Sequence, residues 1–256
     1  MKTAILLSLA TILAGSASAT PRLNEIMNNP PSTDNGFEFV EILSTTGGAE
    51  ALTNVWFVVI EGDGTAPGAG VVDIAIDLSS LSTGANGLLL LRDGTTGLLP
   101  AAAAQTTVAN LLGAGTLENG TQTFLLVTGF TGSTGTDYDT DDNGTLDSTP
   151  WTAVLDAVGT IEDDANPNTG YGASLGFTDL SEVTSTFEHE ALVYDASVPR
   201  WVAANISGTS PGPYTIDVGQ SFPFDVKFDG YALTPGNGNG LVAVPAAAQE
   251  SWSLYE

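Results

Sequence analysis

The sequence predicts an all-β fold organised as a β-sandwich, and three observations support this prediction. About ten short segments rich in aliphatic, β-branched and aromatic residues recur along the chain. Most of the 30 glycines and 13 prolines stand between these segments, where turns require them. Strand signals outnumber helix signals, and the best helix candidate is 100–112, where Pro100 suits a first turn and Gly113 a stop.

The predicted strands share a length of a few residues and boundaries formed by Asn, Pro, Gly or Ser. They are residues 23–26, 37–43, 55–60, 72–78, 88–91, 123–127, 154–158, 190–194, 214–218 and 224–233. In 72–78, Val, Ile and Leu alternate with Asp or Ala, which is the period of a half-buried strand. No repeat and no Pro- or Ser-rich linker divides the series, so we expect one domain.

Residues 1–19 are predicted to be a signal peptide. Lys2 provides a positive start, residues 5–14 an apolar run, and Ala17-Ser18-Ala19 a small-residue cleavage site. The mature chain would be residues 20–256, and no later stretch has the length and apolarity of a membrane span. We therefore expect a secreted protein, either extracellular or at the cell surface, without a membrane span.

The charge balance is strongly acidic, with 5 Lys+Arg against 30 Asp+Glu and a formal net charge of −25. Nucleic-acid binding needs clustered cations, so nucleic acid is excluded as a direct partner. The chain has no cysteine, so a hydrophobic core must stabilise the fold, and 42% hydrophobic residues can build one. Bound calcium would relieve the repulsion between the acidic groups.

A resemblance to a known family begins at residues 23–42. This stretch has the form apolar-Asn-Glu-apolar, then Asn-Pro, then Glu-aromatic-apolar-Glu-apolar. It resembles the lamin tail domain of secreted bacterial proteins, and 85–91 and 233–237 resemble that family's middle strand and closing turn.

The resemblance implies an immunoglobulin-like β-sandwich that accompanies secreted enzymes and adhesins as a non-catalytic module. The chain departs from the family in size, and the excess forms long inserted loops in an acidic insertion at about 131–213.

Two glutamates of the stretch 23–42, Glu38 and Glu41, need groups that pair with their carboxylates. They lie three residues apart, so a strand would point them to opposite faces. A carboxylate that faces inward needs a partner. A salt bridge with Arg22 or Arg92 is the structural interpretation, and a metal or ligand role is the alternative.

A calcium-binding loop is predicted at residues 139–147. Asp139, Asp141, Asn143, Thr145 (through its carbonyl) and Asp147 occupy positions 1, 3, 5, 7 and 9 of an EF-hand-type pattern. Gly144 suits the sharp bend at position 6, and Leu146 would dock into the core.

The loop lacks the glutamate of position 12, where Pro150 stands. Asp137, Asp156 or the Glu162-Asp163-Asp164 cluster would then complete the calcium shell after folding. The alternative is a solvated acidic loop of simple turns. Residues 163–168 resemble a second, looser site, for which a turn is the preferred interpretation.

Signals of catalysis are weak. His189 is the only histidine, no Gly-x-Ser-x-Gly elbow is present, and zinc catalysis needs more His or Cys ligands than the chain has. We expect His189 to lie on a strand surface. Paired carboxylates of the glycosidase kind stay open, as does sugar stacking by Trp56, Trp151, Trp201 and Trp252, although a core role for these tryptophans is preferred.

The leading hypothesis is a secreted or cell-surface, calcium-binding interaction or adhesion module that is not an enzyme. Its partner would be an extracellular protein, a polysaccharide or another copy of the chain. One alternative is a calcium-dependent extracellular hydrolase of polysaccharides or phosphoesters. Another is a self-assembling surface or matrix subunit that pairs through its sheet edges.

Overall fold

The computed structural model describes residues 20–33, 36–64, 68–94, 97–113, 115–164, 166–182, 189–223 and 228–239. The predicted signal peptide lies outside the described residues. Within these residues, regular structure consists of twelve strands and one short 3-10 helix, η1 (Ala173–Leu175). The strands are β1 (Pro21–Met27), β2 (Phe39–Ser44), β3 (Val55–Glu61), β4 (Val72–Asp77), β5 (Leu88–Arg92), β6 (Thr107–Asn110), β7 (Gln122–Thr128), β8 (Ala153–Ile161), β9 (Thr178–Ser181), β10 (Ala191–Asp195), β11 (Arg200–Ser207) and β12 (Thr215–Phe222).

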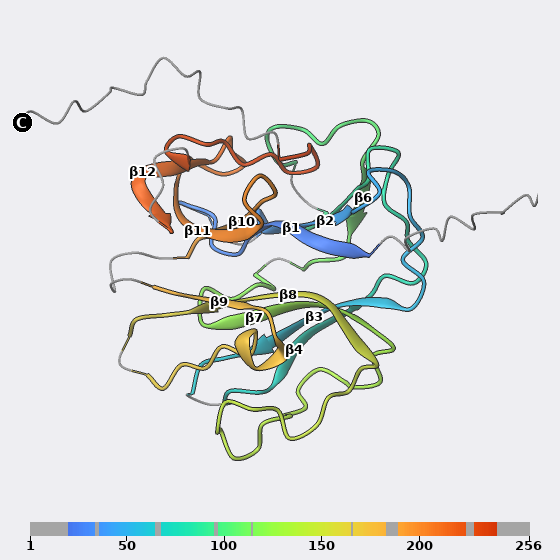
Figure 1. The fold of residues 1–256 in the computed structure, drawn as a ribbon. Coiled ribbons are helices and arrows are strands. Elements are labelled where there is room, and N and C mark those ends of the chain that lie inside the picture. The colour runs from blue at the N-terminus through green and yellow to red at the C-terminus, as the bar shows by residue number, and fades with distance from the viewer. Residues whose placement is uncertain are drawn as a thin grey trace, which may run out of the picture.

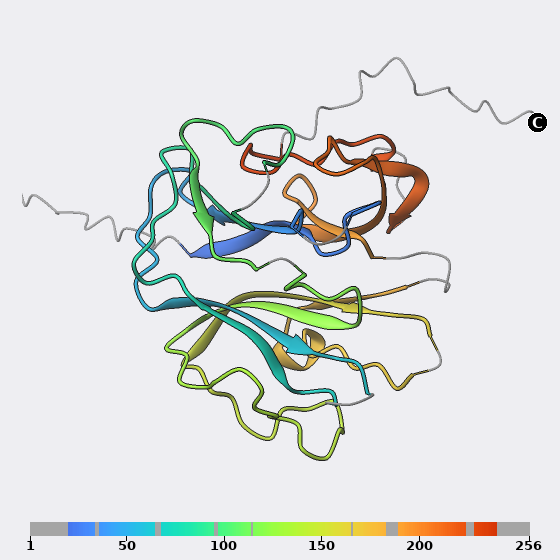
Figure 2. The same cartoon turned by 180° about the vertical axis from the view of Figure 1, so that it is seen from behind.

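The strands form two sheets that pack against each other, seen as an upper and a lower layer in Figure 1 and from behind in Figure 2. The seven-stranded sheet has the order β12-β11-β10-β1-β2-β5-β6, and the five-stranded sheet the order β4-β3-β7-β8-β9. Neighbouring strands are antiparallel, except the parallel pairs β5–β6 and β8–β9. The predicted all-β sandwich is confirmed.

The main hydrophobic core lies between the sheets, because alternate residues of each strand point inward. Val40 and Ile42 of β2 belong to it, as do Phe57 and Val59 of β3. Smaller clusters cover the outer faces, around Phe39 and Tyr214 on the seven-stranded sheet and around Val58 and Tyr171 on the five-stranded sheet. Strands such as Val55–Glu61 are therefore apolar on both faces, which explains their unbroken apolar sequence.

Loops cover much of the outer faces of the sheets. The connection from β7 to β8, residues 129–152, runs below the five-stranded sheet as the yellow-green loop of Figure 1. Most of it, from residue 131 on, lies within the predicted insertion at about 131–213. A further part of that insertion forms β8 to β11 and so belongs to both sheets.

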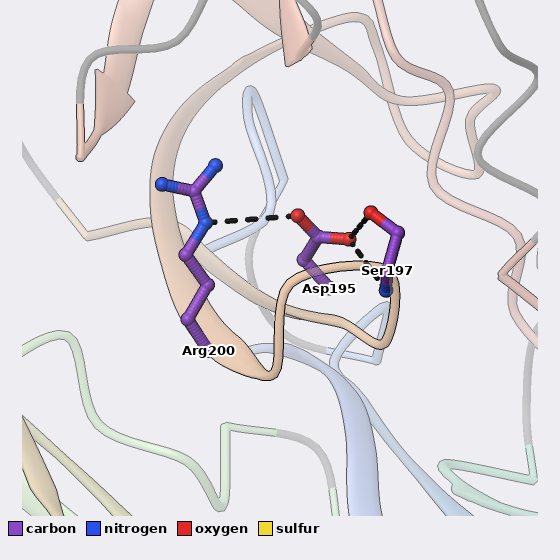
Figure 3. A network of polar contacts seen from close by, with 3 residues as sticks. All are labelled: Asp195, Ser197 and Arg200. Atoms are coloured by element: carbon purple, nitrogen blue, oxygen red, sulfur yellow. Dashed lines mark hydrogen bonds and ion pairs between the residues drawn. The ribbon is translucent and has the colours of Figure 1, made fainter.

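The tight turn between β10 and β11 is held by one acidic side chain (Figure 3). Asp195 is fully buried, and its carboxylate accepts hydrogen bonds from Ser197 N at 3.0 Å and Ser197 Oγ at 2.6 Å. Its other oxygen lies 3.6 Å from Nε of Arg200, its partner across the hairpin. The positive charge of Arg200 therefore compensates the negative charge of the buried Asp195 within the same hairpin.

Nine of the ten predicted strands correspond to observed ones, and β6, β9 and β11 were not predicted. The helix expected at 100–112 is absent, and Thr107–Asn110 instead forms β6 beside β5. The β-branched Thr106, Thr107 and Val108 favour this pairing, and Ala109 enters the main core. Of the strand expected at 224–233, the described part is a turn with one bridge, from Ala232 to Thr215.

The arginine partners expected for Glu41 were wrong. Glu41 lies on the outer face with Phe39, and its carboxylate accepts hydrogen bonds from Asn24 Nδ2 and Gly236 N. Arg22 instead stacks on the Tyr194 ring, 3.9 Å from its centroid, and Arg92 Nε donates to Asn110 Oδ1. Both arginine side chains therefore have partners other than Glu41.

Among the residues that the structure describes, no helix is both long and apolar enough to cross a membrane.

Candidate metal centre

Three carboxylate side chains converge at one end of the five-stranded sheet. Glu61 ends β3, Asp73 is the second residue of β4, and Glu118 precedes β7. Their ligand oxygens all lie within 4.8 Å of one another. Within the described ranges, no other group of three or more His, Asp or Glu side chains meets this criterion. This cluster, called the carboxylate triad below, could hold a metal ion.

A β-bulge brings Asp73 to Glu61. Val59 pairs with Ile74 but Ile60 pairs with Val72, so Asp73 is an extra residue on β4. A bulge re-aims the side chain of the extra residue, which explains how Asp73 joins the triad despite its place in an alternating strand.

Burial and mutual repulsion disfavour the charged forms of the Glu61 and Asp73 carboxyl groups. Glu61 is only 4% exposed, and its Oε1 accepts hydrogen bonds from Gly62 N at 2.8 Å and Asp63 N at 2.7 Å. Burial raises the pKa of Glu61 to about 8, and the neighbouring Glu118 and Asp73 add to the increase. Burial and Glu118 also raise the pKa of Asp73. A bound cation would therefore replace protons at this cluster.

The predicted calcium loop is organised around Asp139. This side chain is fully buried, and its carboxylate accepts hydrogen bonds from Asn143 N at 3.1 Å and Gly144 N at 2.9 Å. It also accepts the hydroxyl of Tyr171 at 2.8 Å, and burial raises the pKa of Tyr171 well above its usual range. Gly144 has a φ of 83°, as the predicted bend requires. The hydrogen bonds that Asp139 accepts thus hold the backbone of the loop around its carboxylate.

The other predicted ligands are exposed, namely Asp141, Asn143, Thr145 and Asp147. Asn143 Oδ1 accepts Thr145 N at 2.9 Å. Asp147 Oδ2 accepts Thr140 Oγ1 at 2.6 Å, and this bond lowers the pKa of Asp147. The structure does not bring the carboxylates of Asp139, Asp141 and Asp147 within 4.8 Å of one another.

The residues expected to complete the calcium shell have other partners. Asp137 Oδ1 accepts Asp139 N at 2.8 Å, which places it beside the loop. Asp156 Oδ2 accepts Leu23 N of β1 at 2.8 Å, so this side chain faces the opposite sheet. Asp164 closes a turn by accepting Asn166 N and Asn168 Nδ2, in agreement with the turn preferred for 163–168.

The predicted calcium loop contacts the β3–β4 hairpin, which carries Glu61 and Asp73 of the triad. Gly70 N donates to the carbonyl of Glu61 at 2.9 Å, and Tyr138 N donates to the carbonyl of Gly70 at 3.0 Å. A Cβ on Gly70 would lie 2.6 Å from Cβ of Asp139, so the two segments are in close contact there. Gly70, which lies between Glu61 and Asp73 in the chain, is therefore in direct contact with the start of the predicted calcium loop.

Charge is unevenly distributed between the two sheets. The described arginines, Arg22, Arg92 and Arg200, belong to β1, β5 and β11 of the seven-stranded sheet. The sequence has no Lys or Arg in 23–91 or 93–199, the ranges that hold the whole five-stranded sheet and its connections. Those connections carry the acidic groups Asp63, Asp137, Asp139, Asp141, Asp142, Asp147, Glu162, Asp163 and Asp164.

The structure also locates the side chains considered for catalysis or sugar stacking. His189 is buried rather than on a strand surface, and burial lowers its pKa to about 4. Trp201 is buried in the main core, and Trp56 and Trp151 pack against the outer cluster of the five-stranded sheet. Trp252 lies outside the described residues.

Comparisons of the chain with protein-family models, curated proteins and solved structures gave no match. The fold and the triad thus define an acidic β-sandwich with a candidate metal centre. The resemblance to the lamin tail domain stays a prediction from the sequence.

Sequence reasoning did not find the triad, because its three residues come from two strands and a loop. Two features of the sequence pointed to these residues. Glu61 ends the apolar run 55–60, and Asp73 is an acidic residue within the alternating segment 72–78.

Proposed function

We propose that this chain is a secreted or cell-surface, calcium-binding interaction module without catalytic activity. The observation that carries the proposal is the absence of Lys and Arg from the five-stranded sheet and its acidic connections. Like charges held together in a folded chain destabilise it unless counter-charges bind. Divalent cations are the counter-charges that an acidic protein meets outside the cell.

Calcium is the cation that this donor set favours. The available donors are carboxylate, amide and carbonyl oxygens, which suit hard cations, and the chain has no cysteine. Calcium accepts six to eight oxygens in flexible arrangements, whereas magnesium demands near-ideal octahedra. Loops such as 139–147 suit the more flexible ion. There the proposed ligands are Asp139, Asp141, Asn143, the carbonyl of Thr145, and Asp147.

The proposed role in binding a partner rests on the exposed position of several calcium ligands. Glu118 and the side chains of Asp141 and Asp147 are exposed, so a cation held by them keeps coordination positions open to solvent. Anionic groups of an extracellular protein or polysaccharide could fill those positions.

A thermal melt of residues 20–256 tests the proposal, first in millimolar calcium and then in excess chelator. With a Kd of about 10⁻⁴ M, calcium at 100 times Kd stabilises the folded state by about 2.7 kcal/mol. That corresponds to a Tm increase of about 5–10 °C for a domain of this size. Magnesium at the same concentration should give a smaller increase. Identical melts in calcium and chelator would refute calcium binding.

A further inference from the structure

Gln122 is a polar side chain buried beside the carboxylate triad. It is the first residue of β7 and lies directly opposite Glu61 of β3, so both side chains project from the same face of the sheet. Gln122 is 1% exposed, and its Nε2 donates a hydrogen bond to the backbone carbonyl of Glu118. This bond also fixes which end of the amide is oxygen.

Two oxygen atoms at this place have no hydrogen-bond donor among the described residues. One is Oε1 of Gln122 and the other is Oδ2 of Asp73, and both are buried. A buried acceptor without a donor costs about 1–3 kcal/mol, and native proteins have few of them. The two orphaned acceptors lie on residues that flank Glu61 on neighbouring strands, one in β4 and one in β7.

The geometry of the triad fits a cation of calcium size. Calcium–oxygen distances are about 2.3–2.6 Å, so two ligand oxygens on opposite sides of the ion are at most about 5.2 Å apart. The triad oxygens all lie within 4.8 Å of one another. Backbone hydrogen bonds from Gly62 and Asp63 fix one oxygen of Glu61. The Glu61 side chain also forms hydrogen bonds with the side chains of Glu118 and Asp73, and a bound ion would replace the shared protons.

We propose that Glu61, Asp73, Glu118 and the amide oxygen of Gln122 bind one calcium ion at the end of the five-stranded sheet. This inference rests on the proposed function and assigns it a site distinct from loop 139–147. The ion would satisfy both orphaned acceptors and offset two of the three carboxylate charges, in a part of the sequence without Lys or Arg. It would also join the starts of β4 and β7 to the end of β3. Water or an anionic partner would complete the coordination on the side of exposed Glu118.

Calorimetric titration of calcium into metal-free residues 20–256 tests this site. Glu118→Gln is the main variant, because Glu118 is exposed and its replacement leaves the core intact. Its Kd for calcium should rise at least about tenfold, since ligand charge sets affinity at such sites. Glu61→Gln should have the same effect. Asp217→Asn, which removes one charge from β12 on the other sheet, should bind calcium like the unmodified chain.

Asp139→Asn separates this inference from the proposed function. It should retain calcium binding at the triad and lose only binding that depends on loop 139–147. The inference is overturned if Glu118→Gln, shown to be folded by circular dichroism, binds calcium with the same Kd and stoichiometry as Asp217→Asn. If Asp139→Asn alone abolishes binding, the proposed function stands and the triad site does not. If the unmodified chain binds no calcium, both fail.

Discussion

Glu25 of β1 lies directly opposite Glu41 of β2, and neither residue is exposed to solvent. Glu25 accepts hydrogen bonds from Thr234 N at 2.9 Å and Thr234 Oγ1 at 3.2 Å. Glu41 accepts Gly236 N at 2.8 Å, so this buried pair holds the segment around residues 234–236 against the sheet. Glu41 also pairs with Leu90 of β5, so the three sequence stretches that resemble a lamin tail domain meet at one place.

The buried pair makes stability depend on pH. Burial raises the pKa of Glu41 from 4.5 to about 8, and burial together with Glu41 raises the pKa of Glu25. A carboxyl group with a raised folded-state pKa takes up a proton on folding between its unfolded and folded pKa values. Its contribution to the free energy of unfolding is therefore complete below pH 4.5 and is lost as pH rises toward 8.

Glu41→Gln should flatten this pH dependence in metal-free protein. Each titrating group contributes a slope of up to about 1.4 kcal/mol per pH unit. Glu61 and Asp156, with pKa values raised to about 8 and 6, keep part of the slope in the variant. Urea unfolding between pH 5 and 8 measures it. Parallel curves for the variant and the unmodified chain would show that Glu41 does not titrate in this range.

Tyr171→Phe should destabilise the protein by about 1–3 kcal/mol, because it leaves the buried Asp139 carboxylate without one of its donors. Tyr214→Phe is the matched control, since its hydroxyl donates to the neutral Ser210 Oγ at 3.0 Å. Hydrogen bonds to charged groups are the stronger ones, so Tyr171→Phe should cost more. Urea unfolding at pH 7 compares the two, and an equal loss would contradict a stronger hydrogen bond to Asp139 than to Ser210.

Gly70→Ala should destabilise the protein strongly. Gly70 has a φ of 93°, and an added Cβ would lie 2.6 Å from Asp139 Cβ and 2.8 Å from Asp139 N. Gly47→Ala introduces a similar backbone strain at a φ of 72° but meets no atom within 4 Å. Strain of this kind costs about 1–3 kcal/mol, and the clash adds to it at Gly70 only. A thermal melt showing equal losses would contradict the contact between the hairpin and the calcium loop.

Asp195→Ala should cost more stability than Arg200→Ala. The aspartate accepts two hydrogen bonds from Ser197 in addition to its ion pair, whereas the Arg200 side chain is 27% exposed. We expect about 2–3 kcal/mol for Asp195→Ala and about 1 kcal/mol for Arg200→Ala. Urea unfolding of both variants gives the order, and the reverse order would show that the ion pair dominates the turn.

The sequence predicted the sandwich because its strands have unmistakable apolar runs between turn residues. Thr178–Ser181 and Arg200–Ser207 escaped prediction, since Asp179 and the alanines at 203–204 weaken their strand signals and pairing with neighbours decides their structure. Residue spacing could identify a loop such as 139–147, where the ligands are local. It could not identify the triad, which depends on a bulge at Asp73 and on the pairing of Glu61 with Gln122.

An anomalous difference map from crystals of residues 20–256 grown in calcium tests the proposed triad site directly. The map should show a peak about 2.3–2.6 Å from carboxylate oxygens of Glu61, Asp73 and Glu118 and from Oε1 of Gln122. A well-ordered triad without such a peak, at a calcium concentration that saturates binding in solution, would contradict it.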